Sequence, residues 1–385
     1  MIFENALVLL PDGVRSGLRV VVTNAKITSI EKTEGTAPCK SIDLDGNYLL
    51  PGFVDVHVHG AVGRDTVEAS ADAFRAICEY HASGGTTSLL LTIATSPVDQ
   101  IVDVLREVRA TQQTIAQLQG VHLEGPFISR ERAGAQCLQN IRNADSDSVA
   151  QLLEYADVIK RVTVAPEIDG ALELIAQLRD RGIAASGGHS DAWDEEARAA
   201  FESGMRHVTH TFNCMSSARR RDGTRVAGLL EFALSEPEVM CELIADGHHV
   251  SSTLMKMLYQ AKRAAGICLV TDATAGAGLP EGATFRLAGV ECVVGDGACY
   301  LADGSALAGS SARMIDLVAT MIRDVGVPLH EAVAMASANP ARAMGLHTKG
   351  RIEVGADADF AVLSPDLEVV QTFVAGERIC SRGEP

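Results

Sequence analysis

The sequence predicts an α/β protein: a (β/α)8 TIM barrel with a small β-sandwich domain formed by both chain ends. Through the middle of the chain, eight apolar, strand-like runs alternate with helical patterns, which is typical of a parallel sheet with crossover helices. Short strand-like runs separated by turn residues occupy both ends. A barrel needs about 250 residues, so a chain of 385 residues leaves room for a second unit.

The two ends predict the small β domain, at 1–49 and 350–385. Its strand-like runs are separated by turn residues, such as the Pro11, Asp12 and Gly13 that follow the first run. Because both ends show the same pattern, we expect them to form one domain. The runs cover 6–10, 18–23, 26–31, 359–363 and 369–374.

The barrel is predicted for residues 50–349. Helical patterns between the strand-like runs end at glycine, as in 191–203 before Gly204. Polar turns interrupt strand-like pieces at 283–304, so we expect a β excursion after the eighth strand. The eight strand-like runs are 53–59, 87–93, 120–124, 162–166, 183–189, 207–213, 240–246 and 268–272.

Composition and charge narrow the functional class. A formal net charge of −17 argues against a nucleic-acid-binding surface, which is normally basic. No stretch reaches the roughly 18 apolar residues of a membrane span, and the amino terminus lacks the basic start of a signal peptide, so a cytoplasmic protein is expected. The 9 cysteines form no CxxC pair, which suits reduced thiols rather than a disulfide framework.

Ionisable residues stand where several barrel strands are predicted to end. His57 and His59 are two apart in one strand, so both imidazoles point to the same side. Barrel enzymes place catalytic groups at the carboxyl ends of their strands, and a buried charge is costly unless it is paired or coordinated. Nitrogen and oxygen donors without thiolate suit Zn²⁺, Fe²⁺, Mn²⁺ or Co²⁺. We therefore predict a divalent metal site, whose other members are Glu124, His189, His210 and Asp272.

One ordered set of motifs extends over nearly the entire chain. The motifs are Pro-Gly-Phe-Val-Asp-Val-His-Val-His-Gly at 51–60, His-Leu-Glu-Gly-Pro-Phe at 122–127, Gly-His-Ser at 188–190, His-Thr-Phe-Asn-Cys-Met at 210–215, Ile-Ala-Asp-Gly-His-His-Val at 244–250, Leu-Val-Thr-Asp-Ala-Thr at 269–274 and Gly-Ala-Asp-Ala-Asp at 355–359. This set resembles the amidohydrolase superfamily and, within it, the N-acetylglucosamine-6-phosphate deacetylases.

The resemblance implies a metal-dependent enzyme. Glu124, His189 and His210 would hold the principal ion, with zinc favoured and iron, manganese or cobalt as alternatives. His57 and His59 would complete a second site in which Glu124 is the bridge. One or two divalent ions are therefore expected.

The implied reaction is hydrolysis of the acetamide of N-acetylglucosamine 6-phosphate to glucosamine 6-phosphate and acetate, without an organic cofactor. Asp272 would take a proton from the attacking water and later deliver one to the departing amine. The resemblance also assigns His249, the Asn213–Cys214 pair and Leu307 to the substrate pocket, and it implies a homodimer.

Two segments depart from the family pattern. A family Lys-Gly-Ala-His segment is here Ala-Gly-Ala-Gln at 133–136. Gln136 can donate a hydrogen bond to a carbonyl, but it cannot become positively charged by binding a proton, so it would polarise the carbonyl bond less.

The second departure concerns a family Arg-Glu-Pro-Gly segment, whose arginine reaches the phosphate across a dimer interface. Here it is replaced by Arg-Arg-Arg-Asp-Gly-Thr-Arg at 219–225. Arg221 is the leading phosphate contact, and a solvated basic loop is an equal alternative.

Three alternative functions stay open. A deacetylase for a different N-acyl amino sugar or amine is supported by Gln136. Deamination or cyclic amide hydrolysis is less favoured, because many cyclic amidases use a modified lysine on strand four, where this chain has Val-Ala-Pro-Glu at 164–167. A non-catalytic scaffold is possible on fold alone, but it would have no physical need to retain all six ionisable side chains.

Overall fold

The barrel is an eight-stranded parallel sheet. The computed structural model describes residues 1–33 and 41–381. In chain order the barrel strands are β6 (Phe53–Val58), β9 (Thr86–Ala94), β10 (Leu118–Glu124), β11 (Ile159–Val164), β12 (Ala184–Gly187), β13 (His207–Val208), β16 (Met240–Leu243) and β17 (Ile267–Leu269). Neighbouring strands pair in the order β17-β16-β13-β12-β11-β10-β9-β6. The eight predicted strand runs are thus confirmed.

The sheet closes between its first and last strands. Just beyond β17, a parallel bridge joins Ala273 to Val58 of β6, and the Asp272 N–H donates to the His57 carbonyl at 2.9 Å. The predicted run 207–213 is shorter than expected, because the left-handed backbone at His210 (φ 29°) takes the chain out of the strand after Val208.

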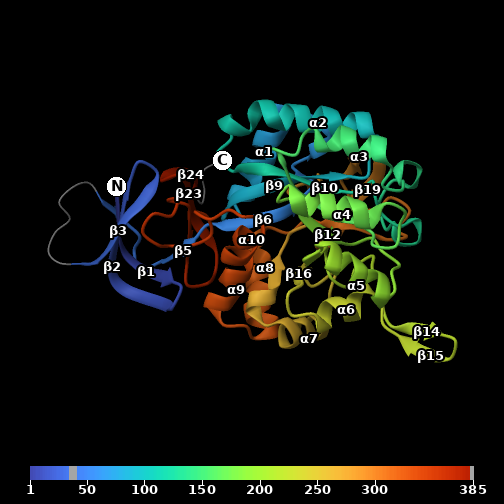
Figure 1. The fold of residues 1–385 in the computed structure, drawn as a ribbon. Helices are drawn as coiled ribbons and strands as arrows, with labels where there is room; N and C mark the ends of the chain where they lie inside the picture. Colours follow the sequence, from blue (N-terminus) through green and yellow to red (C-terminus); the bar gives the residue numbers. More distant parts are fainter. Residues whose placement is uncertain (34–40, 382–385) are drawn as a thin grey trace.

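Helices cover the outside of the barrel, and a smaller sheet lies beside it (Figure 1). In α2, for example, Ile101, Leu105 and Val108 recur at helical spacing and are buried. The helices are α1 (Ala71–Ala82), α2 (Val98–Thr111), α3 (Ser146–Leu153), α4 (Ala171–Asp180), α5 (Asp194–Ser203), α6 (Leu229–Ser235), α7 (Ser252–Lys262), α8 (Met314–Thr320), α9 (Leu329–Ala336) and α10 (Ala338–Ala343). A π-helical turn, Met321–Val325, follows α8, and 3-10 turns cover Thr66–Glu68, Gln112–Thr114, Arg130–Arg132, Leu138–Asn140 and Ala264–Gly266.

The barrel contains two kinds of buried side chain. One group is apolar and includes Val54, Leu90 and Val270, with Ala341 of α10 and Met344 just after it packed in the same cluster. The other group is polar or charged and nonetheless buried. It includes Thr92, His122, Arg161, Thr163, Ser186, Thr209 and Glu242.

The two chain ends build one sheet, as predicted. Its order is β24-β23-β22-β5-β1-β2-β3, with β4 paired to β1, and it consists of β1 (Ile2–Leu10), β2 (Gly13–Thr23), β3 (Lys26–Lys32), β4 (Ser41–Asp43), β5 (Tyr48–Pro51), β22 (Phe360–Leu363), β23 (Val369–Val374) and β24 (Glu377–Ser381). The ring of Phe3 in β1 lies 4.9 Å from that of Phe373 in β23, although two strands separate them in the sheet. The sheet therefore curls over a core of its own, to which Val20, Ile27 and Leu49 belong.

Three β insertions decorate the barrel. Two short strands, β7 (Gly60–Ala61) and β8 (Arg64–Asp65), follow β6, and the hairpin of β14 (Arg219–Arg221) and β15 (Thr224–Val226) projects from the barrel near α5 and α6 (Figure 1). The expected excursion after the eighth strand is a four-stranded meander, β18 (Thr284–Leu287), β19 (Val290–Val294), β20 (Ala298–Leu301) and β21 (Leu307–Ser310). Within residues 1–33 and 41–381, none of the helices is long and apolar enough to cross a membrane.

Candidate metal centre

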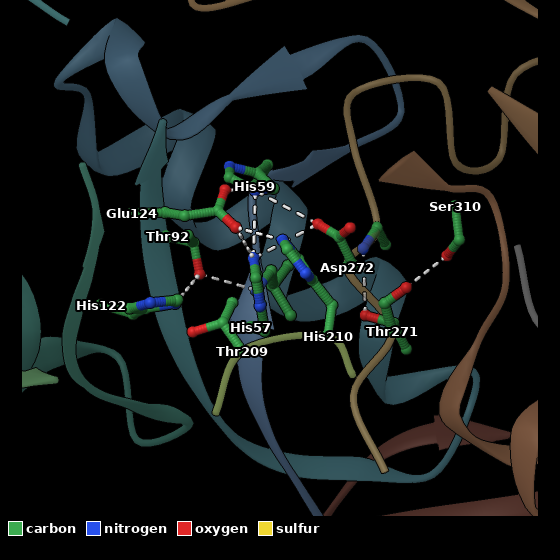
Figure 2. Close-up of polar contacts among 12 residues, drawn as sticks. His57, His59, Thr92, His122, Glu124, Thr209, His210, Thr271, Asp272 and Ser310 are labelled. Carbon is green, nitrogen blue, oxygen red and sulfur yellow. Dashed lines mark hydrogen bonds and ion pairs between the residues drawn. The ribbon is translucent and has the colours of Figure 1, made fainter. Parts of the chain in front are cut away.

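Six ionisable side chains meet at the carboxyl ends of five of the barrel strands. His57 lies in β6 and His59 just after it, and Glu124 is the last residue of β10. The other three follow their strands by two or three residues: His189 after β12, His210 after β13 and Asp272 after β17. Figure 2 shows His57, His59, His210 and Asp272 directed towards Glu124. The structure thus brings the six predicted residues together.

Glu124 is shared by two groups of possible metal ligands. One group is His57, His59 and Glu124, and the other is Glu124, His189 and His210; within each, the ligand atoms lie within 4.8 Å of one another. The Nε2 atoms of His189 and His210 are 3.2 and 3.0 Å from Glu124 Oε1. Those of His57 and His59 are 3.3 Å from Oε1 and 3.1 Å from Oε2 of the same carboxylate.

This donor set fits divalent cations. The Nε2 atoms face each other in pairs, 3.3 Å apart for His57 and His59 and 3.0 Å apart for His189 and His210. Two imidazole nitrogens this close share at most one proton between them, so unshared electron pairs converge on the same space. Buried imidazoles around a shared carboxylate are the ligands that Zn²⁺ and similar ions take in proteins.

Electrostatics in the cluster favour positive charge. Burial would lower the pKa of His57, but the carboxylates of Glu124 and Asp272 raise it well above its ordinary value. The pKa of His59 likewise rises to about 9 in spite of burial, through hydrogen bonds to Asp272 and Glu124. Burial would raise the pKa of Glu124, but His57 and His189 hold it well below its usual range. A cluster that favours protons over the effect of burial also favours a divalent cation.

Asp272 lies beside the first group. Its Oδ1 is 3.3 Å from His57 Nε2 and 3.2 Å from His59 Nε2. Burial would raise the pKa of Asp272, but the two histidines lower it, so the side chain is a carboxylate that can accept a proton.

The backbone at three of these positions is left-handed. The φ angles are 46° at His189, 29° at His210 and 49° at Asp272. Residues with a Cβ rarely adopt this conformation, and such strain clusters at functional sites. The structure holds these side chains at angles that an unstrained strand end would not give.

Neighbouring side chains orient the ligands. The Nδ1–H of His189 donates to the Arg132 carbonyl at 2.9 Å, which leaves Nε2 for the centre. Gln136 donates from Nε2 to Glu124 Oε2 at 2.7 Å, and its Oε1 accepts the Thr95 N–H at 2.7 Å. Gln136 therefore contacts the shared ligand directly, a role that its sequence position did not indicate.

Sequence reasoning did not identify two further members of the site, Arg161 and Glu242. Both are almost fully buried inside the barrel, and Glu242 Oε2 lies 3.2 Å from His57 Nδ1. A signal was present for Glu242, which interrupts the apolar run Met-Cys-Glu-Leu of β16. Arg161 follows a lysine in Ile-Lys-Arg-Val-Thr-Val of β11 and lies just before the predicted run 162–166, so its burial was not evident. Charges inside buried strands require a partner.

The centre opens into a pocket of about 230 Å³. The predicted substrate residues Gln136, Asn213, Cys214, His249 and Leu307 all line it. No lysine or arginine is among the described residues that line this pocket. Its walls therefore provide hydrogen bonds and apolar contact, but no permanent cation.

Arg221 lies outside the pocket, on the β14–β15 hairpin. Its Nη1 donates to Glu195 Oε1 at 2.5 Å, and its guanidinium stacks over Trp193. Arg219 stacks on the same ring and pairs with Asp191 at 2.6 Å. The structure thus places the leading phosphate candidate against carboxylates and an indole of its own chain.

The other two arginines of the hairpin face the opposite way. Arg220 and Arg225 are paired in register, and strand alternation puts them on the side away from Trp193. Each donates to a main-chain carbonyl, Gly223 and Ala218 respectively, and within residues 1–33 and 41–381 neither has an ion pair with a carboxylate.

Comparisons with known proteins agree with this geometry. The model of the amidohydrolase family matches residues 48–379. The N-acetylglucosamine-6-phosphate deacetylase of Bacillus subtilis is 34% identical, over 98% of this chain and 96% of its own. The crystal structure of the Pasteurella multocida deacetylase has a TM-score of 0.92 at 33% identity, covering 98% of both chains. A mutant deacetylase from Mycobacterium smegmatis in complex with N-acetyl-D-glucosamine-6-phosphate has a TM-score of 0.91 at 30% identity, covering 99% of both chains.

Proposed function

The chain belongs to the amidohydrolase family, and on that premise we propose that it hydrolyses N-acetylglucosamine 6-phosphate to glucosamine 6-phosphate and acetate. The observation that carries the proposal is the buried cluster in which two ligand groups share Glu124 beside Asp272, in a chain that matches deacetylases over nearly its full length. The Bacillus subtilis and Pasteurella multocida relatives are N-acetylglucosamine-6-phosphate deacetylases.

Glu124, His189 and His210 would hold the principal metal ion, and His57 with His59 would hold a second through the same Glu124. We propose two ions, because the ligands form two groups, with zinc as the first candidate among zinc, iron, manganese and cobalt, because imidazole and carboxylate are ligands that Zn²⁺ commonly takes. The chemistry supplied by such a cation is Lewis acidity, which makes water a nucleophile near neutral pH and polarises an acyl carbonyl.

Asp272 is the proton carrier in this proposal. Its carboxylate is ionised and lines the pocket, so it can accept a proton from water that attacks the amide carbon. After the tetrahedral stage, the same oxygen returns that proton to the leaving nitrogen. The amine then departs neutral, and the carboxylate is regenerated.

The pocket residues orient the amide and the sugar. Gln136 donates one N–H to Glu124, and its second N–H can donate to a substrate oxygen. His249 is fixed through Nδ1 to Asp246 Oδ2 at 2.7 Å, which leaves Nε2 as the ring nitrogen for a sugar or phosphate contact. Asn213, Cys214 and Leu307 complete the wall.

We also propose a homodimer in which the β14–β15 hairpin supplies the phosphate contact to the other subunit. The pocket lining described above contains no arginine or lysine, whereas the hairpin projects away from its own barrel (Figure 1). Two of its guanidinium groups have no ion pair with any carboxylate in the described part of the chain. Arg220 and Arg225 suit this role better than Arg221, which already pairs with Glu195.

The cytoplasm is the proposed location. Eight cysteines in the described part of the chain are free, and five of them are buried, which suits a reducing compartment.

The test compares amine release from N-acetylglucosamine 6-phosphate with release from N-acetylglucosamine and from N-acyl amines, at measured metal content. We expect a strong preference for the phosphorylated sugar and loss of turnover on chelation. Turnover of other N-acyl compounds only would replace the substrate with the alternative that Gln136 supports. A protein that binds metal but hydrolyses none of them would favour a scaffold.

A further inference from the structure

A buried ion pair lies next to the candidate metal centre, among the buried polar side chains of the barrel. Arg161 of β11 and Glu242 of β16 are 1% and 2% exposed, and Arg161 is the largest of the fully buried side chains in the described residues. Arg161 Nη1 contacts Glu242 Oε1, and Nη2 donates to Ser186 Oγ at 2.6 Å. None of these residues touches the pocket.

Stability alone is a poor reason for such a pair. Removing two charges from water is costly, and well-packed apolar residues in place of a buried ion pair often leave a protein equally stable or more stable. An apolar cluster to which Val54, Leu90 and Val270 belong also packs in the barrel, so its interior can be filled without charge. The position of the pair therefore points to a role at the adjacent centre.

Glu242 reaches both groups of ligands. Its Oε2 lies 3.2 Å from His57 Nδ1 and accepts the main-chain N–H of His210 at 3.0 Å. With its Nδ1–H donated to this carboxylate, the His57 ring must present Nε2 to Glu124. The second bond supports the left-handed backbone at His210, whose φ is 29°.

We propose that Glu242, anchored by Arg161, is a positioning residue that fixes the His57 ring for metal binding. The inference rests on the metal-dependent hydrolase function proposed above. Arg161 contacts this carboxylate and favours its ionised form, so we assign its effect on His57 to the contact with Glu242. A ring that is held in one tautomer and one orientation loses less freedom when it binds an ion.

The two groups should respond differently when Glu242 is changed. The ring of His57 has Glu242 as its Nδ1 partner. In the other group, His189 is oriented by the Arg132 carbonyl and Glu124 by Gln136, and Glu242 touches His210 only through the main chain. Loss of the acceptor should therefore weaken the site of His57 and His59 more than the site of His189 and His210.

The experiment compares two double variants of the full chain, Arg161→Met with Glu242→Gln and Arg161→Met with Glu242→Leu. Both remove the ion pair without leaving an isolated charge, but only glutamine retains an acceptor for His57. Zinc affinities at the two sites are measured by competition with a chelator, and His59→Ala identifies the binding step that belongs to the first group. Thermal unfolding of the metal-free proteins checks that each variant folds.

We expect the leucine variant to bind zinc about 10–100-fold more weakly than the glutamine variant at the site of His57 and His59, with a much smaller change at the other site. Equal affinities in the two folded variants, or equal losses at both sites, would overturn the inference and leave the proposed function standing. Wild-type protein that binds only one ion would also overturn it. Wild-type protein that binds no metal would refute the proposed function itself.

If the leucine variant does not fold, a second measurement tests the proposal with the wild-type protein and the glutamine double variant. In cobalt-loaded wild-type protein, the ring N–H protons of ligating histidines give separate paramagnetically shifted NMR signals. We expect the signal from His57 to persist in D2O, because its partner is a buried carboxylate, and to shift in the glutamine double variant. A His57 signal that exchanges at once, or that does not shift, would overturn the proposal.

Discussion

The buried centre of the barrel and the β14–β15 hairpin use charge in opposite ways. At the centre, the side chains of His57 and Glu124 are 0% and 2% exposed, and each contacts residues from several other strands. On the hairpin, Arg220 and Arg225 lie at the surface, and their hydrogen bonds go to main-chain carbonyls of the same segment.

A single chain completes the centre by itself, whereas it leaves the hairpin arginines available to another molecule. Strand register in a closed barrel decides where the metal ligands lie, whether or not another molecule is present. The hairpin arginines are not positioned by the barrel strands, so their function depends on which molecule approaches them. Changes at the centre should therefore abolish chemistry, whereas changes on the hairpin should alter substrate preference.

The largest effect is expected from Asp272→Asn. The amide retains the shape but cannot accept a proton, so we expect kcat to fall by about 10²–10⁴, while metal content stays at the wild-type level. Initial rates of amine release and metal analysis on the same sample measure both. Asp366→Asn, in an exposed turn before β23, is the control. Wild-type turnover in Asp272→Asn would remove this residue from the mechanism.

On the hairpin, Arg220→Gln combined with Arg225→Gln should lower kcat/KM for the phosphorylated sugar by about 10–100-fold, as expected for a charge-assisted contact of about 1.5–3 kcal/mol. Turnover of the unphosphorylated sugar should change little. Arg221→Gln should have a smaller effect, because its guanidinium is paired with Glu195. A phosphate-specific loss in Arg221→Gln alone would reverse the assignment.

Mixing the hairpin double variant with Asp272→Asn tests the exchange between subunits. A hybrid dimer would contain one site with an intact Asp272 and a wild-type hairpin from the partner. We expect activity on the phosphorylated sugar to rise above the sum of the separate proteins. Simple additivity, with exchange of subunits verified, would argue that each hairpin acts on its own subunit or on none.

A smaller effect is expected at Gln136, which belongs to the centre although it comes from a loop. Gln136→Leu keeps most of the volume but removes the hydrogen bonds to Glu124 and to the Thr95 N–H. We expect kcat/KM to fall by about tenfold for phosphorylated and unphosphorylated sugars alike. Gln139→Leu, three residues on and exposed, is the control. A loss confined to one substrate would instead make Gln136 a specificity residue.

The centre could be predicted from the sequence because its residues follow strand periodicity. His57 and His59 are two apart in a strand, and Glu124 ends another, so their convergence follows from a parallel barrel alone. His210 required more, since the strand stops at Val208 and a left-handed turn carries the ligand. Its place in the predicted strand run made it a candidate ligand, and the family resemblance then assigned it to the principal ion.

The remaining contacts depend on distances that no local pattern encodes. Arg161 and Glu242 are 81 residues apart, and only barrel closure brings their charges together. Gln136 looked like a substrate contact, yet its loop also folds back to Glu124. Two of the hairpin arginines are engaged by Trp193, Asp191 and Glu195, which lie around the start of the neighbouring helix, and only the structure shows which two. The sequence indicated the basic segment but not its two faces.

The smallest effect concerns His249, at the boundary between the centre and the substrate pocket. Burial would lower its pKa, but the hydrogen bond and charge of Asp246 raise it above the ordinary value. Because the pKa of His249 is higher in the folded state, its protonation stabilises the fold. This stabilisation is fully present below the unfolded pKa of about 6.5 and is lost as pH rises through the folded pKa.

The pKa of Asp246 is lowered in the folded state, because His249 outweighs the opposing effect of burial. The stabilisation by ionised Asp246 is therefore lost in acid.

The pair should therefore stabilise the fold most between mildly acidic and neutral pH, by an amount of the order of 1 kcal/mol. Thermal unfolding of wild type and His249→Gln across pH measures it, with the exposed His330→Gln as control. We expect the difference in Tm to shrink on the alkaline side. A difference that stays constant from pH 5 to pH 9 would mean that His249 is neutral when folded. Its contact with a phosphate would then be an ordinary hydrogen bond, and the cationic part of recognition would rest entirely on the hairpin.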